Sequence, residues 1–254
     1  ISLSYYILVR RDGMEWTKEA VINRIAEVSK KGFIGIPDGM YRNDDGIVGQ
    51  LLEREFNINE NNLHIADLGT YELKGMRVKK GKSNKLTLFH QKPTSGMSPN
   101  EIFSRFSYER PSQRDGSLKR KLFTTVKGNR QNNLGLTLKS TNESEIHLYY
   151  HDEYLCTWDL SSGEGKIKQI LFTMAETEGT ANSKGEKFHF IKAFILSNPK
   201  NIYEAIQNGA VVLEFCIDQP AEDYLKKKPH DRGPHIRIPV KKLNALFDSV
   251  EQIL

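Results

Sequence analysis

The stretch Asp67-Leu68-Gly69-Thr70-Tyr71-Glu72-Leu73-Lys74 carries the pattern from which the fold and chemistry of this chain are inferred. If residues 71–74 form a strand, Glu72 and Lys74 point to one face while Leu73 points into the core. Asp67 lies within reach of them if the chain turns at Gly69. Two carboxylates and an ammonium group then converge on one point. Such a group can hold a hard divalent cation through oxygen ligands and place a water beside it, which predicts metal-assisted hydrolysis of a phosphodiester.

The same pattern also occurs by chance, and the alternative is a surface strand with an ordinary acid–base pair. The chain of 254 residues is long enough for one large domain or two lobes. Its mean hydropathy of −0.55 and pI of about 9.0 indicate a polar, mildly basic protein, which permits a polyanionic partner. Cys156 and Cys216 are too few and too far apart for a disulfide framework or a zinc site, and they suit the reducing cytoplasm. No apolar run approaches membrane-spanning length.

Residues 1–13 have the wrong order of features for a secretion signal, because the apolar part precedes the arginines. Arg10-Arg11-Asp12-Gly13 can be encoded by a purine-rich ribosome-binding sequence just before Met14. We therefore expect translation to start at Met14, with residues 1–13 as a non-native extension read in frame.

Apolar periodicity and turn signals predict an α/β chain. Helices are expected at residues 18–30, 47–56, 101–106, 202–207 and 240–253. Strands are expected at residues 86–90, 119–123, 134–138, 146–150, 154–160, 167–174, 187–196 and 211–217. The strand at 86–90 is expected to pair with the strand that carries Glu72.

Three charged segments point to nucleic acid. The first has five cations without an intervening acid and is either a solvated loop or a phosphate-gripping one: Arg77, Lys79, Lys80, Lys82 and Lys85. The second, residues 127–133, has no apolar residue and is either a loop that reaches into a groove or an exposed hairpin loop. The third, residues 226–237, combines lysine, histidine, arginine and aspartate in a mixture that suits readout of G·C pairs; a metal site there is the weaker interpretation.

Residues 46–53 (GIVGQLLE), followed by Asp67 and Glu72-Leu73-Lys74, resemble the MutH-like branch of the PD-(D/E)XK nucleases. In that branch a helix ending in Gly-x-x-Leu-Glu supplies a further acid. The likeness extends from Trp16 to the C-terminus toward type II restriction endonucleases of the BcnI type, and more weakly of the MvaI type. It runs through residues 45–50, 72–77, 86–90 and 229–235. The chain departs from the motif at Ala66, where many members have proline, and residues 1–13 have no counterpart.

The resemblance implies a magnesium-dependent type II restriction endonuclease. Its substrate would be double-stranded DNA with the site CC(C/G)GG or a closely related one, cut to leave 5′-phosphate and 3′-hydroxyl ends. It would act as a monomer that cuts the two strands in separate events, with a cognate DNA methyltransferase as its functional rather than physical partner.

Residue roles follow from the same resemblance. Asp67 and Glu72 are expected to bind the metal together with the Leu73 carbonyl. Lys74 is expected to act on the attacking water, and Glu53 to supply the helical acid. The expected DNA contacts are His90 and His235 at the central base pair, one in each lobe; His230, Asp231 and Arg232 at the flanking pairs; and Lys127, Asn129, Arg130 and Arg237.

The implied architecture is a restriction-endonuclease-like mixed sheet with flanking helices. A catalytic lobe (residues 14–110) and a recognition lobe (residues 111–254) would hold DNA in a cleft between them. Two other functions stay open from the sequence. One is a MutH-type nicking enzyme of mismatch repair, and the other is a DNA-binding module with an inactive centre.

Overall fold

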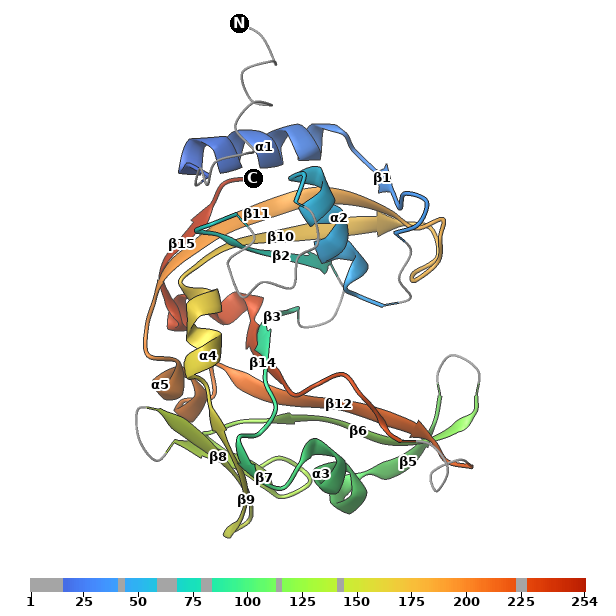
Figure 1. The fold of residues 1–254 in the computed structure, drawn as a ribbon, viewed down its shortest axis with the longest axis vertical. Coiled ribbons are helices and arrows are strands. Elements are labelled where there is room, and N and C mark those ends of the chain that lie inside the picture. The colour runs from blue at the N-terminus through green and yellow to red at the C-terminus, as the bar shows by residue number, and fades with distance from the viewer. Residues whose placement is uncertain are drawn as a thin grey trace, which may run out of the picture. The chain divides into compact units, whose positions relative to one another are not determined.

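The structure, a computed structural model, describes residues 16–40, 44–58, 68–78, 84–112, 116–140, 144–222 and 228–254 (Figure 1). Residues 1–13 and Asp67, on which two expectations rest, lie outside these ranges. The described helices are α1 (Lys18–Lys30), α2 (Ile47–Glu55), α3 (Pro99–Phe106), α4 (Ser161–Glu164), α5 (Ile202–Gln207) and the 3-10 helices η2 (Gly165–Ile167) and η3 (Val240–Ala245). The described strands are β1 (Ile34–Gly35), β2 (Glu72–Arg77), β3 (Lys85–His90), β4 (Ser95–Gly96), β5 (Tyr108–Pro111), β6 (Leu118–Val126), β7 (Leu136–Ser140), β8 (Glu145–Tyr150), β9 (Glu153–Asp159), β10 (Gln169–Glu178), β11 (Lys187–Pro199), β12 (Val212–Pro220), β13 (His230–Asp231), β14 (His235–Pro239) and β15 (Phe247–Gln252).

The chain folds into two compact units that interleave in sequence. The first unit takes the described residues up to Asn84, then Lys166–Asn198 and Ser249–Leu254. The second takes Lys85–Gly165 and Pro199–Asp248. This division differs from a single boundary near residue 110, because the chain must return to the first unit to supply β10, which pairs with β2, and β11, which pairs with β10. The assignment of catalytic and recognition roles to two lobes stays a prediction.

The sheet of the first unit has the order β1-β11-β10-β2, and β15 also pairs with β11. β10 and β11 form a long antiparallel pair. β2 runs parallel to β10, with Glu72 opposite Ile170 and Leu73 opposite Leu171. Parallel neighbours need a long crossover connection. Here the connection from β2 to β10 contains Lys85–Gly165, the first of the two segments that form the second unit.

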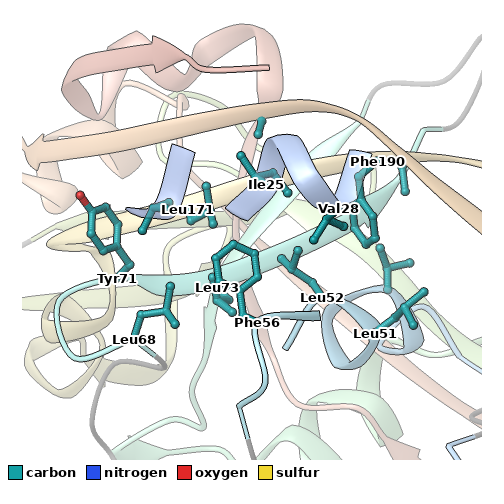
Figure 2. Packing of buried hydrophobic residues seen from close by; sticks show 14 of the residues in the cluster. Ile25, Val28, Leu51, Leu52, Phe56, Leu68, Tyr71, Leu73, Leu171 and Phe190 are labelled. Atoms are coloured by element: carbon teal, nitrogen blue, oxygen red, sulfur yellow. The ribbon is translucent and has the colours of Figure 1, made fainter. Parts of the chain in front are cut away.

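Two helices cover one face of this sheet (Figure 1). Helix α1 begins where the Thr17 hydroxyl accepts a hydrogen bond of 3.2 Å from the Ala20 amide. Its apolar stripe and that of α2 are fully buried against the sheet, and Figure 2 shows Ile25 and Val28 of α1 beside Leu51 and Leu52 of α2. This common core fixes α2 on the sheet through dispersion and removal of apolar surface from water.

The second unit contains two antiparallel sheets. One has the order β3-β14-β12-β6-β5, with β13 also pairing with β12, and the other has the order β4-β9-β8-β7. Helix α3 begins with a capping box between Ser98 and Glu101. The buried Trp158 packs 6.4 Å from Phe215, measured between ring centroids, and its indole N–H donates to the Gln91 carbonyl at 3.0 Å.

Two sequence expectations about the helices and strands are wrong. Residues 240–253 form η3 followed by strand β15, and not one helix. Their apolar spacing fits a helix, but β11 offers an edge whose backbone groups need partners, and Ile253 donates to the Ala193 carbonyl at 2.9 Å. Strand β3 pairs with β14 and not with β2. The apolar run of β10 takes the place beside β2, as is common for a strand buried on both faces.

Candidate active site and DNA-contacting residues

The predicted acid–amine pair is present on β2. The Lys74 ammonium donates a hydrogen bond of 2.7 Å to Oε1 of Glu72, and both side chains are largely buried, with 22% and 13% exposed. The alternation of the strand places them side by side on one face, as predicted. Leu73, between them, is 4% exposed and belongs to the core under α1 and α2. A largely buried ion pair on a strand differs from the solvated surface pair of the alternative interpretation.

The register with β10 shows which face carries the pair. Leu73 lies opposite Leu171, and both are in the helix-covered core (Figure 2). Glu72 and Lys74, the residues on either side of Leu73, lie opposite Ile170 and Phe172, the residues on either side of Leu171. They therefore point to the face of the sheet that α1 and α2 do not cover.

Glu53 lies on α2, on the other side of β2. The helix approaches the strand most closely at Gly75, where a Cβ would meet the Val48 carbonyl oxygen at 3.0 Å. β2 is the terminal strand in the order of the described sheet. A site shared by Glu53, Glu72 and Lys74 thus requires Glu53 to reach past the edge of β2.

The oxygen atoms that β2 offers as metal ligands suit a hard cation. The Glu72 carboxylate and the Leu73 carbonyl are oxygen ligands of the kind that Mg²⁺ and Ca²⁺ prefer. Within the ranges that the structure describes, no group of three or more histidine, cysteine or acidic side chains is placed to hold a metal ion. The third expected ligand, Asp67, lies outside those ranges, so the complete ligand set stays a prediction.

The two predicted base-pair histidines lie together in the second unit. His90 and His235 are opposite each other on β3 and β14, and their ring centroids are 4.2 Å apart. The expectation of one histidine in each lobe is wrong, because β3 pairs with β14. His90 is exposed, whereas His235 is only 5% exposed and its Nδ1 has no hydrogen-bond partner among the described residues. Burial, with the nearby His90 and Arg237, lowers the pKa of His235 to about 4.

The predicted base-reading segment is partly a strand. His230 and Asp231 form β13, which pairs with β12, and the Asp231 carboxylate accepts from the Gly233 amide at 2.8 Å. Arg232 is exposed and its guanidinium donates to Asp218 at 3.1 Å. Asp218 was not predicted; its only sequence signal is an acid near the end of an apolar strand. Together these contacts hold the segment in one conformation at the edge of the sheet.

Arg237 is held in a network that the sequence did not predict. Its guanidinium donates to Glu214 at 2.6 Å and to the Thr87 hydroxyl at 2.9 Å. Glu214 also accepts from the ammonium of Lys85 and, at 2.8 Å, from the Thr125 hydroxyl. Burial opposes the charge of Glu214, but these donors and cations outweigh it and lower its pKa. An acid within the apolar strand Val212–Pro220 was the one signal for such a network.

The predicted basic loop follows β6. Asn129 and Arg130 are exposed, and Lys127 is half-buried. Burial, followed by the charges of Arg130 and Lys242, lowers the pKa of Lys127. A cluster of like charges is costly for the free protein, and an anion such as a phosphate relieves that cost.

The environment of Arg77 fits neither interpretation of the basic run, a solvated loop or a loop that binds phosphate. It is 7% exposed and engaged by acids, so it neither lies in a solvated loop nor is available to grip phosphate. Lys79, Lys80 and Lys82 lie outside the described residues.

Comparison with solved structures identifies the class of fold. A structure described as "Restriction endonuclease MvaI-cognate DNA substrate complex" matches with a TM-score of 0.70 and 19% identity, over 94% of this chain and 100% of that chain. One described as "Restriction endonuclease MvaI in the absence of DNA" matches with a TM-score of 0.46 and 21% identity, over 95% of this chain and 100% of that chain. The first match confirms the predicted restriction-endonuclease-like α/β fold.

The sequence defines the family. Residues 22–247 match the MvaI/BcnI restriction endonuclease family, and the chain belongs to it. It is therefore a type II site-specific nuclease, as the resemblance implied. No curated protein matches the chain. Within the described part of the chain, none of the helices has the length and apolar character needed to cross a membrane.

Proposed function

We propose that the protein is a magnesium-dependent endonuclease that cuts double-stranded DNA at CC(C/G)GG or a closely related site. It would leave 5′-phosphate and 3′-hydroxyl ends and act in the cytoplasm as a monomer, one strand at a time. A cognate DNA methyltransferase would protect the host's own sites. Membership of the MvaI/BcnI restriction endonuclease family over residues 22–247 is the observation that carries the proposal. The cognate DNA complex of the similar MvaI structure supports the choice of substrate.

The chain's own residues divide the chemistry between them. Glu72, the Leu73 carbonyl and Asp67 would hold the cation, which when bound offsets negative charge at the scissile phosphate. The Lys74 ammonium lies beside the Glu72 carboxylate at 2.7 Å, where it can orient the attacking water and take part in its proton transfer. The partial burial of both groups strengthens their electrostatic action on the phosphate. Glu53 would contribute a further acid from α2.

The second unit would supply sequence readout. Arg232, Asp231 and His230 would contact the flanking G·C pairs, since arginine and histidine donate to guanine acceptors and aspartate accepts from the cytosine amino group. The adjacent His90 and His235 would lie at the central pair, where the exposed His90 ring is the one open to a base. Lys127, Asn129, Arg130 and Arg237 complete the proposed DNA-contacting set.

Digestion of DNA of known sequence tests the proposal directly. Purified protein is incubated with plasmid and Mg²⁺, and the fragment ends are mapped; a parallel reaction contains EDTA. We expect discrete double-strand fragments with ends at CC(C/G)GG, and no product with EDTA. Nicked circles alone would instead indicate a MutH-type enzyme. Binding without metal-dependent cutting would indicate an inactive DNA-binding module.

A further inference from the structure

Arg77, the last residue of β2, is the centre of an ionic cluster in which Arg77 and Glu186 are buried. Its Nε and Nη2 donate to the two carboxylate oxygens of Glu186, each at 2.8 Å, and Glu186 is completely buried. Its Nη2 also donates to the Asn182 side-chain oxygen at 3.1 Å. Its Nη1 pairs with the Asp45 carboxylate and lies 3.5 Å from the Asp44 carbonyl. All three guanidinium nitrogens of Arg77 therefore contact acceptor oxygens in the cluster.

The cluster joins three segments of the first unit. Arg77 comes from β2, Asp44 and Asp45 immediately precede α2, and Asn182 and Glu186 belong to the connection between β10 and β11. The backbone N–H of Asn182 also donates to the Glu186 carboxylate at 2.8 Å, which fixes that connection around the acid. On the other side, the Gly46 amide donates to the Asp44 carboxylate at 2.8 Å and orders the start of α2. The start of the helix and the end of the strand are thus tied to one guanidinium.

The position of Arg77 on β2 gives the cluster a link to the candidate site. Leu73, Gly75 and Arg77 alternate onto the helix side of the strand, whereas Glu72 and Lys74 lie on the other side. Gly75 lies against Val48, the second residue of α2. Two neighbouring positions on the helix side of β2 therefore hold α2: Gly75 packs against Val48, and Arg77 pairs with Asp45 just before the helix.

Burial alone would favour a neutral side chain at position 77, so specific partners must stabilise the charged guanidinium. Burial acts against the Arg77 charge, but the hydrogen bonds that Arg77 donates to Glu186 and the negative charge of Asp45 outweigh it and raise the pKa of Arg77. A planar guanidinium with a two-point carboxylate contact sets direction as well as distance, which apolar packing does not. Such a pair suits the task of fixing one element on another.

We infer that Arg77 is a positioning residue of the nuclease site: with Glu186 and Asp45 it fixes α2 on β2 and so places Glu53 relative to Glu72 and Lys74. This inference rests on the proposed function. Because Glu53 must reach past the edge of β2, a small shift of α2 along the strand changes where its carboxylate lies. Misplacement of a catalytic group by about 1 Å can lower a rate by about 100-fold.

Three variants test the inference in the full-length protein. Arg77→Lys keeps the charge but loses the two-point contact, and Glu186→Gln keeps the shape but loses the charge. Asp45→Asn is the mild variant, since the Asp45 side chain is 67% exposed and its change leaves the core intact. Val28→Ala, a core truncation in α1 of the same unit, is the control for loss of stability alone. Each is made in the wild-type and in the Glu53→Gln background.

Two measurements are made on each variant. The first is the single-turnover cleavage rate at saturating DNA and Mg²⁺, below the unfolding temperature. The second is Mn²⁺ binding to the protein without DNA, followed by electron paramagnetic resonance. We expect Arg77→Lys and Glu186→Gln to lower the rate by about 10- to 100-fold and to weaken Mn²⁺ binding, and Asp45→Asn to do so by a smaller factor. In the Glu53→Gln background these losses should shrink to less than about threefold, because coupled sites are not additive.

Each outcome decides the matter. Equal losses in both backgrounds, or losses that follow stability as Val28→Ala does, make Arg77 a structural residue only and overturn the inference while the proposed function stands. A wild-type protein that neither cuts DNA nor binds Mn²⁺ overturns the proposed function and the inference with it.

Discussion

Lys74 donates a hydrogen bond of 2.7 Å to Oε1 of Glu72, two positions away on the same face of β2. The parallel strand β10 fixes the register of both residues, with Ile170 and Phe172 opposite them. Among the residues that the structure describes, no side chain pairs with the second oxygen of Glu72, which suits it to bind a divalent cation. A single strand thereby presents one acceptor and one donor to the same point in space.

Replacement of Glu72 by alanine should abolish cleavage and preserve binding. The variant loses the oxygen ligand, and we expect a fall in single-turnover rate of at least about 1,000-fold, within the range for loss of a group that acts in the transition state. Gel-shift titration with cognate DNA in Ca²⁺ should give an affinity close to that of the wild type. Glu251→Gln is the matched control, because Glu251 pairs with Lys18 at 2.6 Å in the same unit. Normal cutting by Glu72→Ala would refute the assigned site.

A methyl group at Gly75 should destabilise the protein through the contact between α2 and β2. The added Cβ of Gly75→Ala would meet the Val48 carbonyl oxygen at 3.0 Å and its side chain at 3.1 Å. Backbone atoms of a packed helix yield little, so we expect a loss of about 1–3 kcal/mol in the free energy of unfolding. Gly49→Ala, inside α2 with nothing within 4 Å, should instead add about 0.5–1 kcal/mol. Urea titrations compare the two; equal effects would contradict the proposed close contact.

Local signals account for the parts of the fold that the sequence predicted. Thr17 and the stripe of Val21, Ile25 and Val28 predict α1, because a cap and a 3.6-residue period act within one element. The alternation of Glu72, Leu73 and Lys74 likewise predicts the face of each residue on β2. The family resemblance added the restriction-endonuclease class, which the family match confirms.

Partners distant in the chain account for most of what was missed. Arg77 looked like part of a basic run, but its acid Glu186 lies 109 positions away. The pairing of β3 with β14 brings His90 to His235, and no local pattern encodes that choice. For residues 240–253 the apolar spacing fits a helix, but pairing with β11 makes the later part of this segment the strand β15.

The basic loop after β6 should make DNA binding depend on salt. Lys127 lies near Arg130 and Lys242, and phosphate would replace their mutual repulsion with attraction. Lys127→Ala and Arg130→Ala should each reduce the slope of log affinity against log salt concentration by about 0.9. Lys200→Ala is the control in the same unit, because Lys200 is exposed and pairs with Asp248 at 3.4 Å. Fluorescence anisotropy with cognate DNA in Ca²⁺ measures the slopes. An unchanged slope for both loop variants would remove the loop from the DNA-contacting set.

Buried His235 should make stability fall with acidification. Burial, with His90 and Arg237, lowers its pKa from 6.5 to about 4, so between these pH values the unfolded chain binds a proton that the folded protein does not. The folded state is therefore at full stability above pH 6.5, and stability is lost as the pH falls toward 4, by on the order of 3 kcal/mol. His235→Gln should lack this component, so its stability relative to the wild type should rise across that window. Ile236→Val, the neighbouring core change in β14, adds no titrating group and should run parallel to the wild type. Urea titrations at several pH values would contradict the prediction if His235→Gln and the wild type ran parallel as well.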